Sequence, residues 1–570
     1  LRDGVDPQKY GIGIKELWEV APDRHHKGLV IHSQGWPLDA STGGDMLTQK
    51  LLAHVPLLLH GAAKRVAIVG LGSGITAASA LSHPIESLDV LEISPEVAEA
   101  SRLFATNGRS PLDDPRTRLL VADGRTHLAL GRRAYDVIIA EPSNPWMAGV
   151  AALFTQEYFQ SARARLAPGG VVCQWVNTYD ISAPDLRSVV ATFTNVFPHA
   201  TLWMAGEGDL LMIGSTDALE PRLANVERGY ATESVRADLQ SIRVSSPFVL
   251  LSMFVAGEVP ASRFGAGAAL QDDDRMALEF SAPLALHTRD QRDNVSALRS
   301  LDVAASRPEI VARAWAGATA AELSHRSQIL RRAGAFEAAY DAAATAVGRD
   351  PADPEALQSL VEASAPLARQ ADAMGLLSGA VTRRPDVLAP RLALSRLHAA
   401  TGQIDPAIAD VGEWLRVHED DLPAVEQLAS IFSDMGDAER LATAVEILGR
   451  RPERPAAAYY AAALAFMKHD LAGAEAAASR ALRLDPGFAR AMNLLGAIFA
   501  TKGDVAQARH TFEAALALDP QDPTTYQNLA TLEMNAGQRD VAARLFAEAL
   551  TIDPTSVAAR QGLASTHTSH

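Results

Sequence analysis

The sequence predicts an α/β domain with a mostly parallel, Rossmann-like sheet, followed by an all-α solenoid of helical repeats. Two observations lead to this prediction. Between residues 64 and 215, short apolar runs alternate with helical segments, which is typical of a parallel sheet with helices on both faces. From about residue 320 the sequence becomes rich in alanine and leucine and repeats with a period of 34 residues.

Seven short apolar runs are the candidate strands, since runs of this length are typical of buried parallel strands. They are Arg65–Val69, Leu88–Leu91, Arg118–Val121, Asp136–Ala140, Val171–Trp175, Ala200–Met204 and Leu210–Ile213. After the second run, Ser94 precedes Pro95 and Glu96. An N-cap residue, a first-position proline and a first-turn acid together predict a helix start. Ser182 begins a weaker example of the same pattern.

Three regions follow from this pattern. Residues 1–60 are expected to form a small β-rich N-terminal region, in which Thr48–Leu59 is a helix that leads into the core. Residues 61–310 form the α/β domain, which ends in a helical insert with an acidic loop at Asp272–Asp274. Residues 318–566 form the repeat domain.

Prolines mark the end of successive repeats in the last region. They are Pro351, Pro385, Pro452, Pro486, Pro520 and Pro554, and Glu419 stands where one further proline is expected. Small and aromatic residues such as Gly496, Ala508 and Phe512 fall at their places in the tetratricopeptide pattern of paired antiparallel helices. We expect about six repeats and a final capping helix at Ser556–Leu563. Such repeats imply a protein or peptide ligand in their concave groove.

The composition narrows the possible partners. The formal charge of −16 over 570 residues disfavours nucleic acid and is compatible with a small cationic substrate, although acidic surfaces more commonly serve solubility. Cys173 is the only cysteine, and the adjacent His25 and His26 would point to opposite faces of a strand, so no metal site is predicted. No apolar run approaches the ~18 residues of a membrane span. We expect a cytoplasmic protein, or a membrane-tethered one if a segment precedes Leu1.

A glycine loop and an acid mark the candidate ligand site. Gly70, Gly72 and Gly74 follow the first predicted strand and open a helix, so the backbone there can approach a ligand closely. Glu92 ends the second strand, where a carboxylate accepts hydrogen bonds from ribose hydroxyls. Each feature also has a plainer interpretation, a tight turn for the glycines and a helix-capping carboxylate for Glu92.

Two further features follow the next two strands. Asp123, with Gly124 behind it, is placed to accept a hydrogen bond from an adenine amino group, or to form an Asx-turn. The stretch Glu141–Trp146 contains two prolines, which predict a fixed loop over the pocket rather than a helix. Because all four features lie at the carboxyl ends of strands, where open α/β sheets bind ligands, they together predict a nucleoside site.

Residues 29–290 resemble the spermidine synthase (polyamine aminopropyltransferase) family, whose members have a methyltransferase-like fold. The matching stretches are Thr48–Leu57, the glycine loop, Leu91–Pro95, Val121–Gly124, Tyr135–Ile139 and Leu166–Val171. The resemblance implies decarboxylated S-adenosylmethionine as the aminopropyl donor and an amine as the acceptor. It also implies that Glu92 holds the ribose of the donor and Asp123 its adenine. A homodimer is a further expectation.

The sequence departs from the family pattern on the amine side. Ser73 stands where the family has an aspartate that binds the donor's ammonium group. Glu141 aligns with the catalytic aspartate, and Asn144 aligns with a second aspartate that binds the acceptor amine. Thr48 and Gln49 replace a tyrosine–histidine pair. The chain is similar in these positions to a bacterial branch of the family whose members are often fused to an upstream membrane domain.

The resemblance makes Glu141 the candidate general base that takes the proton of the attacking amine. Asp39 and Asp45 would supply the missing acceptor-side charge if their loop folds over the pocket. Trp146 would form part of the pocket wall. Asp272–Asp274 is another candidate acidic set, although a solvated loop is the favoured interpretation. Cys173 is expected to be a core residue. Trp175 is a second candidate for the pocket wall, although tryptophans such as Trp146 and Trp175 more often belong to the core.

Three functions are therefore open at this point. The first is an aminopropyltransferase-like enzyme with a helical-repeat partner domain. The second is a methyltransferase that uses intact S-adenosylmethionine, because Ser73 removes a carboxylate that would repel the carboxylate of that donor. The third is a non-catalytic adaptor, in which the α/β domain senses a nucleoside and the repeats bind a protein.

Overall fold

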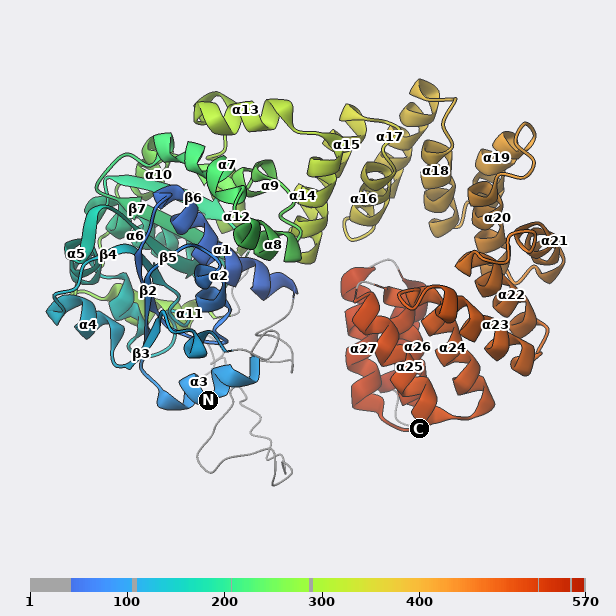
Figure 1. Ribbon diagram of the computed structural model, residues 1–570. Coiled ribbons are helices and arrows are strands. Elements are labelled where there is room, and N and C mark those ends of the chain that lie inside the picture. The colour runs from blue at the N-terminus through green and yellow to red at the C-terminus, as the bar shows by residue number, and fades with distance from the viewer. Residues whose placement is uncertain are drawn as a thin grey trace, which may run out of the picture.

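The computed structural model describes residues 43–104, 110–206, 208–286, 291–520, 522–553 and 556–567. Figure 1 shows an α/β domain followed by an array of helix pairs that bends into an arch. The strands expected in the first 42 residues lie outside the described part of the chain. The helix expected at Thr48–Leu59 is confirmed within α1 (Gly43–His60).

The α/β domain has one eight-stranded sheet with the order β3-β2-β1-β4-β5-β7-β6-β8. The strands are β1 (Arg65–Val69), β2 (Ser87–Glu92), β3 (Thr117–Val121), β4 (Tyr135–Ala140), β5 (Leu166–Asn177), β6 (His199–Met204), β7 (Asp209–Ser215) and β8 (Phe254–Ala256). Strands β1 to β5 pair in parallel, whereas β7 is antiparallel to β5 and β6, and β6 is antiparallel to β8. The mostly parallel sheet and all seven predicted strands are confirmed, and β8 is an addition.

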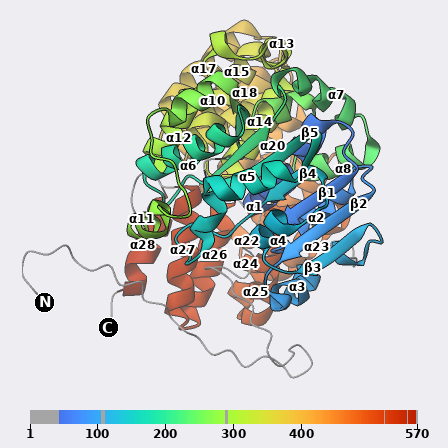
Figure 2. The ribbon, with the colours of Figure 1, turned by 90° about the vertical axis from the view of Figure 1, so that its left-hand side faces the viewer.

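Helices cover both faces of this sheet (Figure 2). The α-helices of the domain are α1, α2 (Ile75–Leu81), α3 (Pro95–Ala100), α4 (Gly124–Leu130), α5 (Gln156–Ala164), α6 (Ala183–Val196), α7 (Asn225–Tyr230), α8 (Glu233–Ser241), α9 (Pro247–Leu251), α10 (Glu258–Gly265), α11 (Ala277–Ala285), α12 (Gln291–Arg299) and α13 (Glu309–Gly317). Short 3-10 helices lie at Ser101–Phe104, Pro111–Asp113, Val150–Phe154, Glu220–Ala224 and Ala304–Ser306.

The alternation of side chains along each strand divides the core into two layers. In β1, Val66 and Ile68 pack in the same cluster as the apolar side of α1 and α2. Their neighbours Ala67 and Val69 pack in a second cluster with α5 and α6. Because successive strand residues point to opposite faces, both faces of the sheet are buried. This explains why the strands are almost continuously apolar.

Helix caps predicted from the sequence are present. The Ser94 hydroxyl accepts a hydrogen bond from the Val97 backbone N–H at the start of α3. The Ser182 hydroxyl likewise accepts one from the Asp185 N–H at the start of α6. Each cap satisfies a backbone donor that has no partner within its own helix. The two helix starts are therefore confirmed.

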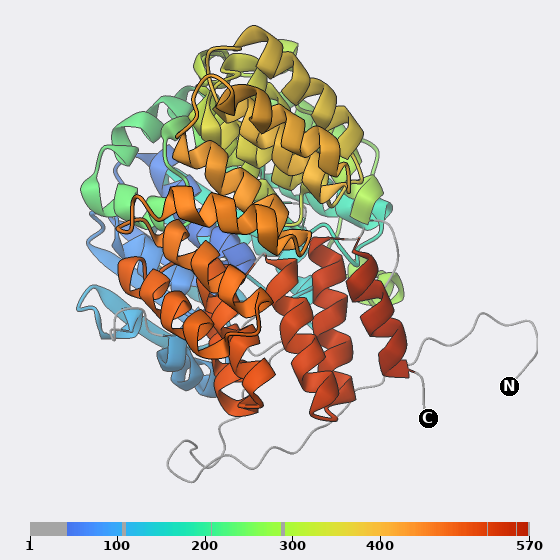
Figure 3. The same ribbon diagram turned by 90° about the vertical axis from the view of Figure 1, so that its right-hand side faces the viewer.

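The solenoid consists of seven antiparallel helix pairs among the described residues (Figure 3). They are α14 (Ala320–Arg332) and α15 (Phe336–Arg349), α16 (Pro354–Ser364) and α17 (Gln370–Arg383), α18 (Ala389–Ala400) and α19 (Ile404–Leu415), α20 (Leu422–Asp434) and α21 (Ala438–Leu448), α22 (Pro455–Met467) and α23 (Leu471–Leu484), α24 (Ala489–Lys502) and α25 (Val505–Leu518), and α26 (Pro523–Asn535) and α27 (Arg539–Ile552). The expectation of about six repeats falls one short of these seven pairs, although Pro351, which follows α15, marks the end of the first pair. The capping helix is confirmed as α28 (Val557–His567), whereas Pro554 lies outside the described residues.

The repeat pattern has a direct packing reason. Gly496 on α24 faces Phe512 on α25, and a Cβ atom on this glycine would lie 2.7 Å from the aromatic ring. The small residue thus lets the two helices of a pair approach each other while the ring fills the space beside them.

The first repeats pack directly on the α/β domain. One hydrophobic cluster contains Leu47 of α1, Phe254 of β8 and Leu397 of α18. At the junction, a Cβ on Gly206 would lie 2.8 Å from the Cβ of Ala333. The α/β domain and the beginning of the solenoid therefore share a continuous core. No helix in the described ranges is both long and apolar enough to cross a membrane.

Candidate functional site

The glycine loop lies at the carboxyl end of β1 and leads into α2. Gly70, Gly72 and Gly74 have φ angles of +94°, +51° and +82°, a region that side chains with a Cβ atom disfavour. A Cβ atom on Gly70 would lie only 2.6 Å from the backbone oxygen of Glu141. The loop after β1 and the loop after β4 are thus in direct contact.

Glu92 holds the glycine loop in place. Its side chain is only 7% exposed, and one oxygen accepts a hydrogen bond of 3.0 Å from the Leu71 backbone N–H. The other oxygen accepts one of 2.9 Å from the Ser94 N–H. A carboxylate has about four acceptor positions, so Glu92 can accept further hydrogen bonds. The carboxylate thus orders the loop and keeps acceptor capacity.

Asp123 caps helix α4. Its carboxylate accepts hydrogen bonds from the backbone N–H groups of Arg125 and Thr126, at 3.1 and 3.2 Å. This is the turn-type interpretation that the sequence left open. Gly124 behind it is buried, and a Cβ atom there would lie 2.6 Å from the Val69 Cγ1 atom. Helix α4 therefore packs closely against β1, and Asp123 lies at the carboxyl ends of the parallel strands.

Glu141 is positioned by α2. Its Oε2 atom accepts a hydrogen bond of 2.7 Å from the Thr76 hydroxyl. The Thr76 oxygen also lies 3.0 Å from the backbone oxygen of Gln49 on α1. The Gln49 side chain accepts a 3.1 Å hydrogen bond from the Ser73 hydroxyl of the glycine loop. The candidate base, the glycine loop and α1 thus meet through direct contacts.

Tyr179, which follows β5, holds the loop after Glu141. The Tyr179 hydroxyl donates a hydrogen bond of 3.3 Å to the Asn144 side-chain oxygen. The Tyr179 ring also meets Trp146 edge-on, with 6.0 Å between ring centroids. The loop is therefore held by side chains as well as by its prolines. Asp39 lies outside the described residues, and so does the side chain of Asp45.

The two remaining sequence candidates are the acidic loop and Cys173. Asp273 forms an ion pair with Arg125, and its N–H donates to Glu157 of α5, so the acidic loop packs on the α4–α5 side of the domain. Cys173 is buried in β5, and burial raises the pKa of its thiol well above the ordinary value. A protonated buried thiol fits a core residue rather than a nucleophile.

One acid of the site was missed from the sequence. Asp209 begins β7, and its two carboxylate oxygens accept 2.7 Å hydrogen bonds from the Thr48 hydroxyl and the Trp175 indole N–H. Burial raises the pKa of this carboxyl group, against the effect of these hydrogen bonds. The sequence did contain a signal, because the first residue of an antiparallel strand lies at the carboxyl edge of its parallel neighbours.

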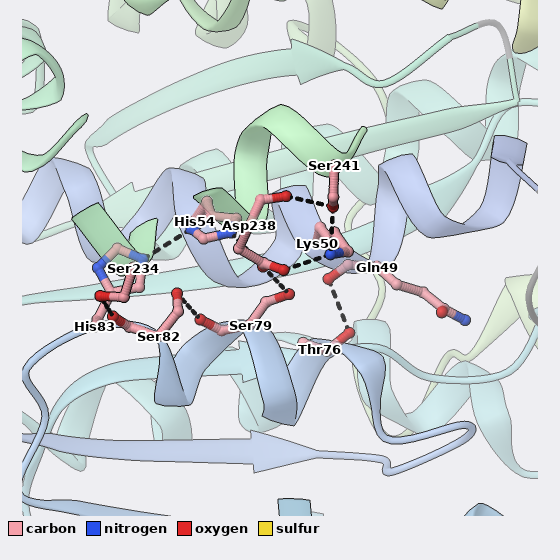
Figure 4. Close-up of polar contacts among 10 residues, drawn as sticks. All are labelled: Gln49, Lys50, His54, Thr76, Ser79, Ser82, His83, Ser234, Asp238 and Ser241. Carbon is pink, nitrogen blue, oxygen red and sulfur yellow. Dashed lines mark hydrogen bonds and ion pairs between the residues drawn. The ribbon is translucent and has the colours of Figure 1, made fainter. Parts of the chain in front are cut away.

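A buried polar network behind the site holds α1, α2 and α8 together (Figure 4). Asp238 of α8 forms an ion pair with Lys50 of α1 and accepts hydrogen bonds from His54 and from Ser79, at 2.8 and 2.7 Å. Burial alone would raise its pKa, but these donors hold the pKa of Asp238 well below the ordinary value. Since α1 also carries Gln49, the network fixes one wall of the site.

Two histidines extend this network. The Nδ1 atom of His54 lies 2.9 Å from Nε2 of His83, while its Nε2 atom contacts Asp238. The carboxylate requires a proton on Nε2 of His54, so Nδ1 accepts and His83 donates. Burial lowers the pKa of both rings, and for His83 the charge of His54 lowers it further. Burial therefore favours the neutral form of both rings.

The fold is that of an α/β protein of the Rossmann-like, methyltransferase-like class. The family model described as spermine/spermidine synthase domain matches residues 45–205. The chain is 32% identical over 193 residues to a polyamine aminopropyltransferase of Pseudomonas syringae pv. tomato, which covers 32% of this chain and 67% of that protein. The chain therefore belongs to the spermine/spermidine synthase family.

Two other relatives show how far the likeness extends. Spermidine synthase of Dictyostelium discoideum is 31% identical over 163 residues, which is 28% of this chain and 57% of that enzyme. Putrescine N-methyltransferase 2 of Nicotiana tabacum is 31% identical over 172 residues, which is 30% of this chain and 48% of that enzyme. The chain thus spans only about half the length of these two relatives.

Two further family models match other parts of the chain. A tetratricopeptide-repeat model matches residues 465–533, within the solenoid. The fusion of a spermidine synthase domain to tetratricopeptide repeats is thereby confirmed. A model described as ETF-QO, ubiquinone-binding matches residues 10–62, most of which lie outside the described residues.

Proposed function

We propose that this protein transfers an aminopropyl group from decarboxylated S-adenosylmethionine to an amine, and that its solenoid binds a protein or peptide. The observation that carries the proposal is the contact between the loops after β1 and β4. It places the Glu141 backbone against Gly70, and Thr76 of α2 holds the Glu141 carboxylate beside the glycine loop. Transfer from an adenosyl donor requires a base next to the loop that binds the nucleoside.

The donor would lie along the carboxyl edge of the sheet. Glu92 has lone pairs left for the ribose hydroxyls beyond its bonds to Leu71 and Ser94. Asp123 would meet the adenine amino group through the acceptor capacity that remains beyond its cap of α4. Trp146 would form part of the wall of the acceptor pocket.

The chemistry needs a neutral amine. Its nitrogen attacks the methylene carbon next to the donor's sulfonium, a carbon–nitrogen bond forms, and the carbon–sulfur bond breaks to release a neutral thioether. The attacking nitrogen loses a proton, which Glu141 accepts. General-base help of this kind contributes typically ~10²–10⁴-fold to the rate, and the fixed geometry of the bound pair contributes much of the rest.

A second candidate is methyl transfer from intact S-adenosylmethionine. One observation favours it: Ser73, in the place of the family's aspartate, donates a hydrogen bond to Gln49 and carries no charge that would repel the donor's carboxylate. A relative named putrescine N-methyltransferase also lies among the similar proteins.

The solenoid offers a groove for a protein ligand. A cavity of about 720 Å³ runs along the first helices of five successive pairs, α16, α18, α20, α22 and α24. Arg396 and Arg490 line it together with Glu426, Asp434 and Tyr460. A groove with both charge signs and an aromatic residue fits a polar peptide better than an apolar helix.

Calorimetric titration of the full chain with both donor forms tests the proposal. We expect the decarboxylated donor to bind at least tenfold more tightly, ~1.4 kcal/mol. A preference for intact S-adenosylmethionine would favour methyl transfer instead. Donor binding without turnover on any amine would favour the adaptor function.

Glu141→Gln tests the role of the base. We expect unchanged donor affinity and a ~10²–10⁴-fold lower kcat, because only proton transfer is removed. Glu86→Gln is the matched control, since Glu86 is 67% exposed and pairs with Lys64 on the surface. Equal rates for both variants and the wild type would refute Glu141 as the base.

A further inference from the structure

We propose that the junction between the α/β domain and the solenoid binds a short carboxylate with an apolar tail, and that Arg326 of α14 holds its charged end. The site is a cavity of about 160 Å³ between the two parts of the chain. None of its lining residues belongs to the glycine loop or to the loop after Glu141. The inference is therefore independent of the proposed function.

Both parts of the chain contribute walls to this cavity. Met204 at the end of β6 and Met253 just before β8 line it from the α/β domain. Arg326, Ile329 and Leu330 line it from α14, the first helix of the solenoid. Helix α14 packs against α9 of the α/β domain (Figure 1). A ligand in the cavity would thus contact both parts of the chain at once.

Arg326 lacks a counter-ion. Its Nε atom is buried and has no hydrogen-bond partner among the residues that the structure describes. One terminal nitrogen donates a hydrogen bond of 3.2 Å to the backbone oxygen of Ser252. Arg331 on the same helix, by contrast, pairs with Glu362 at 2.8 Å. Because a charge that leaves water without a partner is costly, an anion bound to Arg326 would stabilise the junction.

The charges around Arg326 also favour an anion. Arg299 lines the same cavity, and the guanidinium groups of Arg307 and Arg326 lie 4.5 and 5.1 Å from the ring centroid of Trp315. Asp302 is a lining carboxylate, but its two oxygens accept hydrogen bonds of 2.6 and 2.9 Å from Arg307. Burial, and next the charge of Arg299, lower the pKa of Arg326 to about 10, so this group stays charged at neutral pH.

The size and lining of the cavity indicate the class of anion. At ~30 Å³ for each water-sized group, it has room for about five or six non-hydrogen atoms. A carboxylate can accept two hydrogen bonds from a guanidinium group, one of them here from the unpartnered Nε of Arg326. The methionine, isoleucine and leucine side chains of the wall suit an apolar tail. A four-carbon carboxylate meets both requirements.

Calorimetric titration of the full chain tests the site. The probes are butanoate, butanamide, which has nearly the same shape without the charge, and inorganic phosphate, which has the charge without the tail. For the wild type we expect butanoate to bind at least tenfold more tightly than either, because only butanoate makes both kinds of contact. In hydrogen–deuterium exchange, butanoate should slow exchange in α14 and α9 and leave the glycine loop unchanged.

Three variants make the result specific. Arg326→Gln removes the charge and should weaken butanoate binding at least tenfold. Ala338→Leu keeps every charge and fills the cavity from α15, so it should also abolish binding, and it tests the site even if Arg326→Gln fails to fold. Arg332→Gln is the matched control, because Arg332 ends the same helix, is exposed and lies outside the cavity. It should bind butanoate like the wild type.

The outcomes decide the proposal. Butanoate binding that is lost in Arg326→Gln and Ala338→Leu but kept in Arg332→Gln supports it, whether or not the protein transfers an aminopropyl group. Equal affinity of the wild type for butanoate and butanamide, or equal butanoate affinity of the wild type and Arg326→Gln, would overturn it. Phosphate binding as tight as that of butanoate would contradict the apolar tail, and slower exchange only outside α14 and α9 would contradict the location.

Discussion

Removal of the Asp238 carboxylate should loosen α1, α2 and α8 together. In Asp238→Ala the Lys50 ammonium, whose side chain is 9% exposed, keeps only the Ser241 hydroxyl as a partner. His54, which is fully buried, and Ser79 lose the acceptor of their donated hydrogen bonds. Breaking one side of a buried ion pair costs ~3–5 kcal/mol. Because Asp238 itself is 24% exposed, we take the lower end, about 3 kcal/mol.

Hydrogen–deuterium exchange of the full chain measures this effect locally. A loss of about 3 kcal/mol corresponds to roughly hundredfold faster exchange of the most protected amides in α1, α2 and α8. Asp238→Asn should give a smaller increase, because the amide oxygen still accepts hydrogen bonds but carries no charge. Since α1 carries Gln49, donor affinity should fall in parallel.

The control variant is Glu86→Ala, which breaks the surface pair with Lys64, where both side chains are more than half exposed. Exposed pairs contribute about 1 kcal/mol or less, so exchange should rise at most about fivefold. If Asp238→Ala changed exchange no more than this control, the network would not anchor α1, and the reasoning would be refuted.

Three more predictions follow from local structure. Acidification below pH 6.5 should lower the unfolding temperature, because burial lowers the pKa of His54 and His83 and only the unfolded chain then takes up their protons. This stability is complete above about pH 6.5 and is lost as the pH falls. In thermal scans at a series of pH values, an unfolding temperature that rises on acidification would contradict the prediction. Gly124→Ala should destabilise the domain by ~1–3 kcal/mol, because its Cβ would lie 2.6 Å from Val69, and an unchanged urea midpoint would exclude that clash. Ser94→Ala should cost ~1 kcal/mol through loss of the α3 cap, whereas Ser94→Asp, which restores an acceptor, should retain most of the stability in the same urea titration.

The sheet could be predicted because burial on both faces makes each parallel strand a continuous apolar run. Strand β1 was predicted with its exact bounds, Arg65–Val69. Strand β8 was missed because Phe254–Ala256 is too short to show a period. It exists because β6 offers it a free edge, and this is a property of the assembled sheet rather than of the local sequence.

The site was predictable only where its residues follow strands. Glu92 and Glu141 stand directly after apolar runs, so their place at the sheet edge could be inferred from the order of the chain. Asp209 and Asp238 could not be found in this way. Asp209 meets Thr48 across 161 positions and Asp238 meets Lys50 across 188, and such pairings depend on how α1 packs. The Asp123 cap was left open because a ligand-binding acid and a capping acid look alike in sequence.

The core shared by the α/β domain and the first repeats bears on how the chain folds as it is synthesised. Leu47 and Leu397 belong to one apolar cluster, and Ala318, at the start of the predicted repeat domain, lies inside it. The ribosome adds ~5–20 residues per second, so the synthesis of α14 to α18 takes several seconds after residue 318 has been added. Until then one side of the nascent α/β domain is uncovered and open to chaperones. The first repeats thus complete the hydrophobic core of the domain that carries the candidate site.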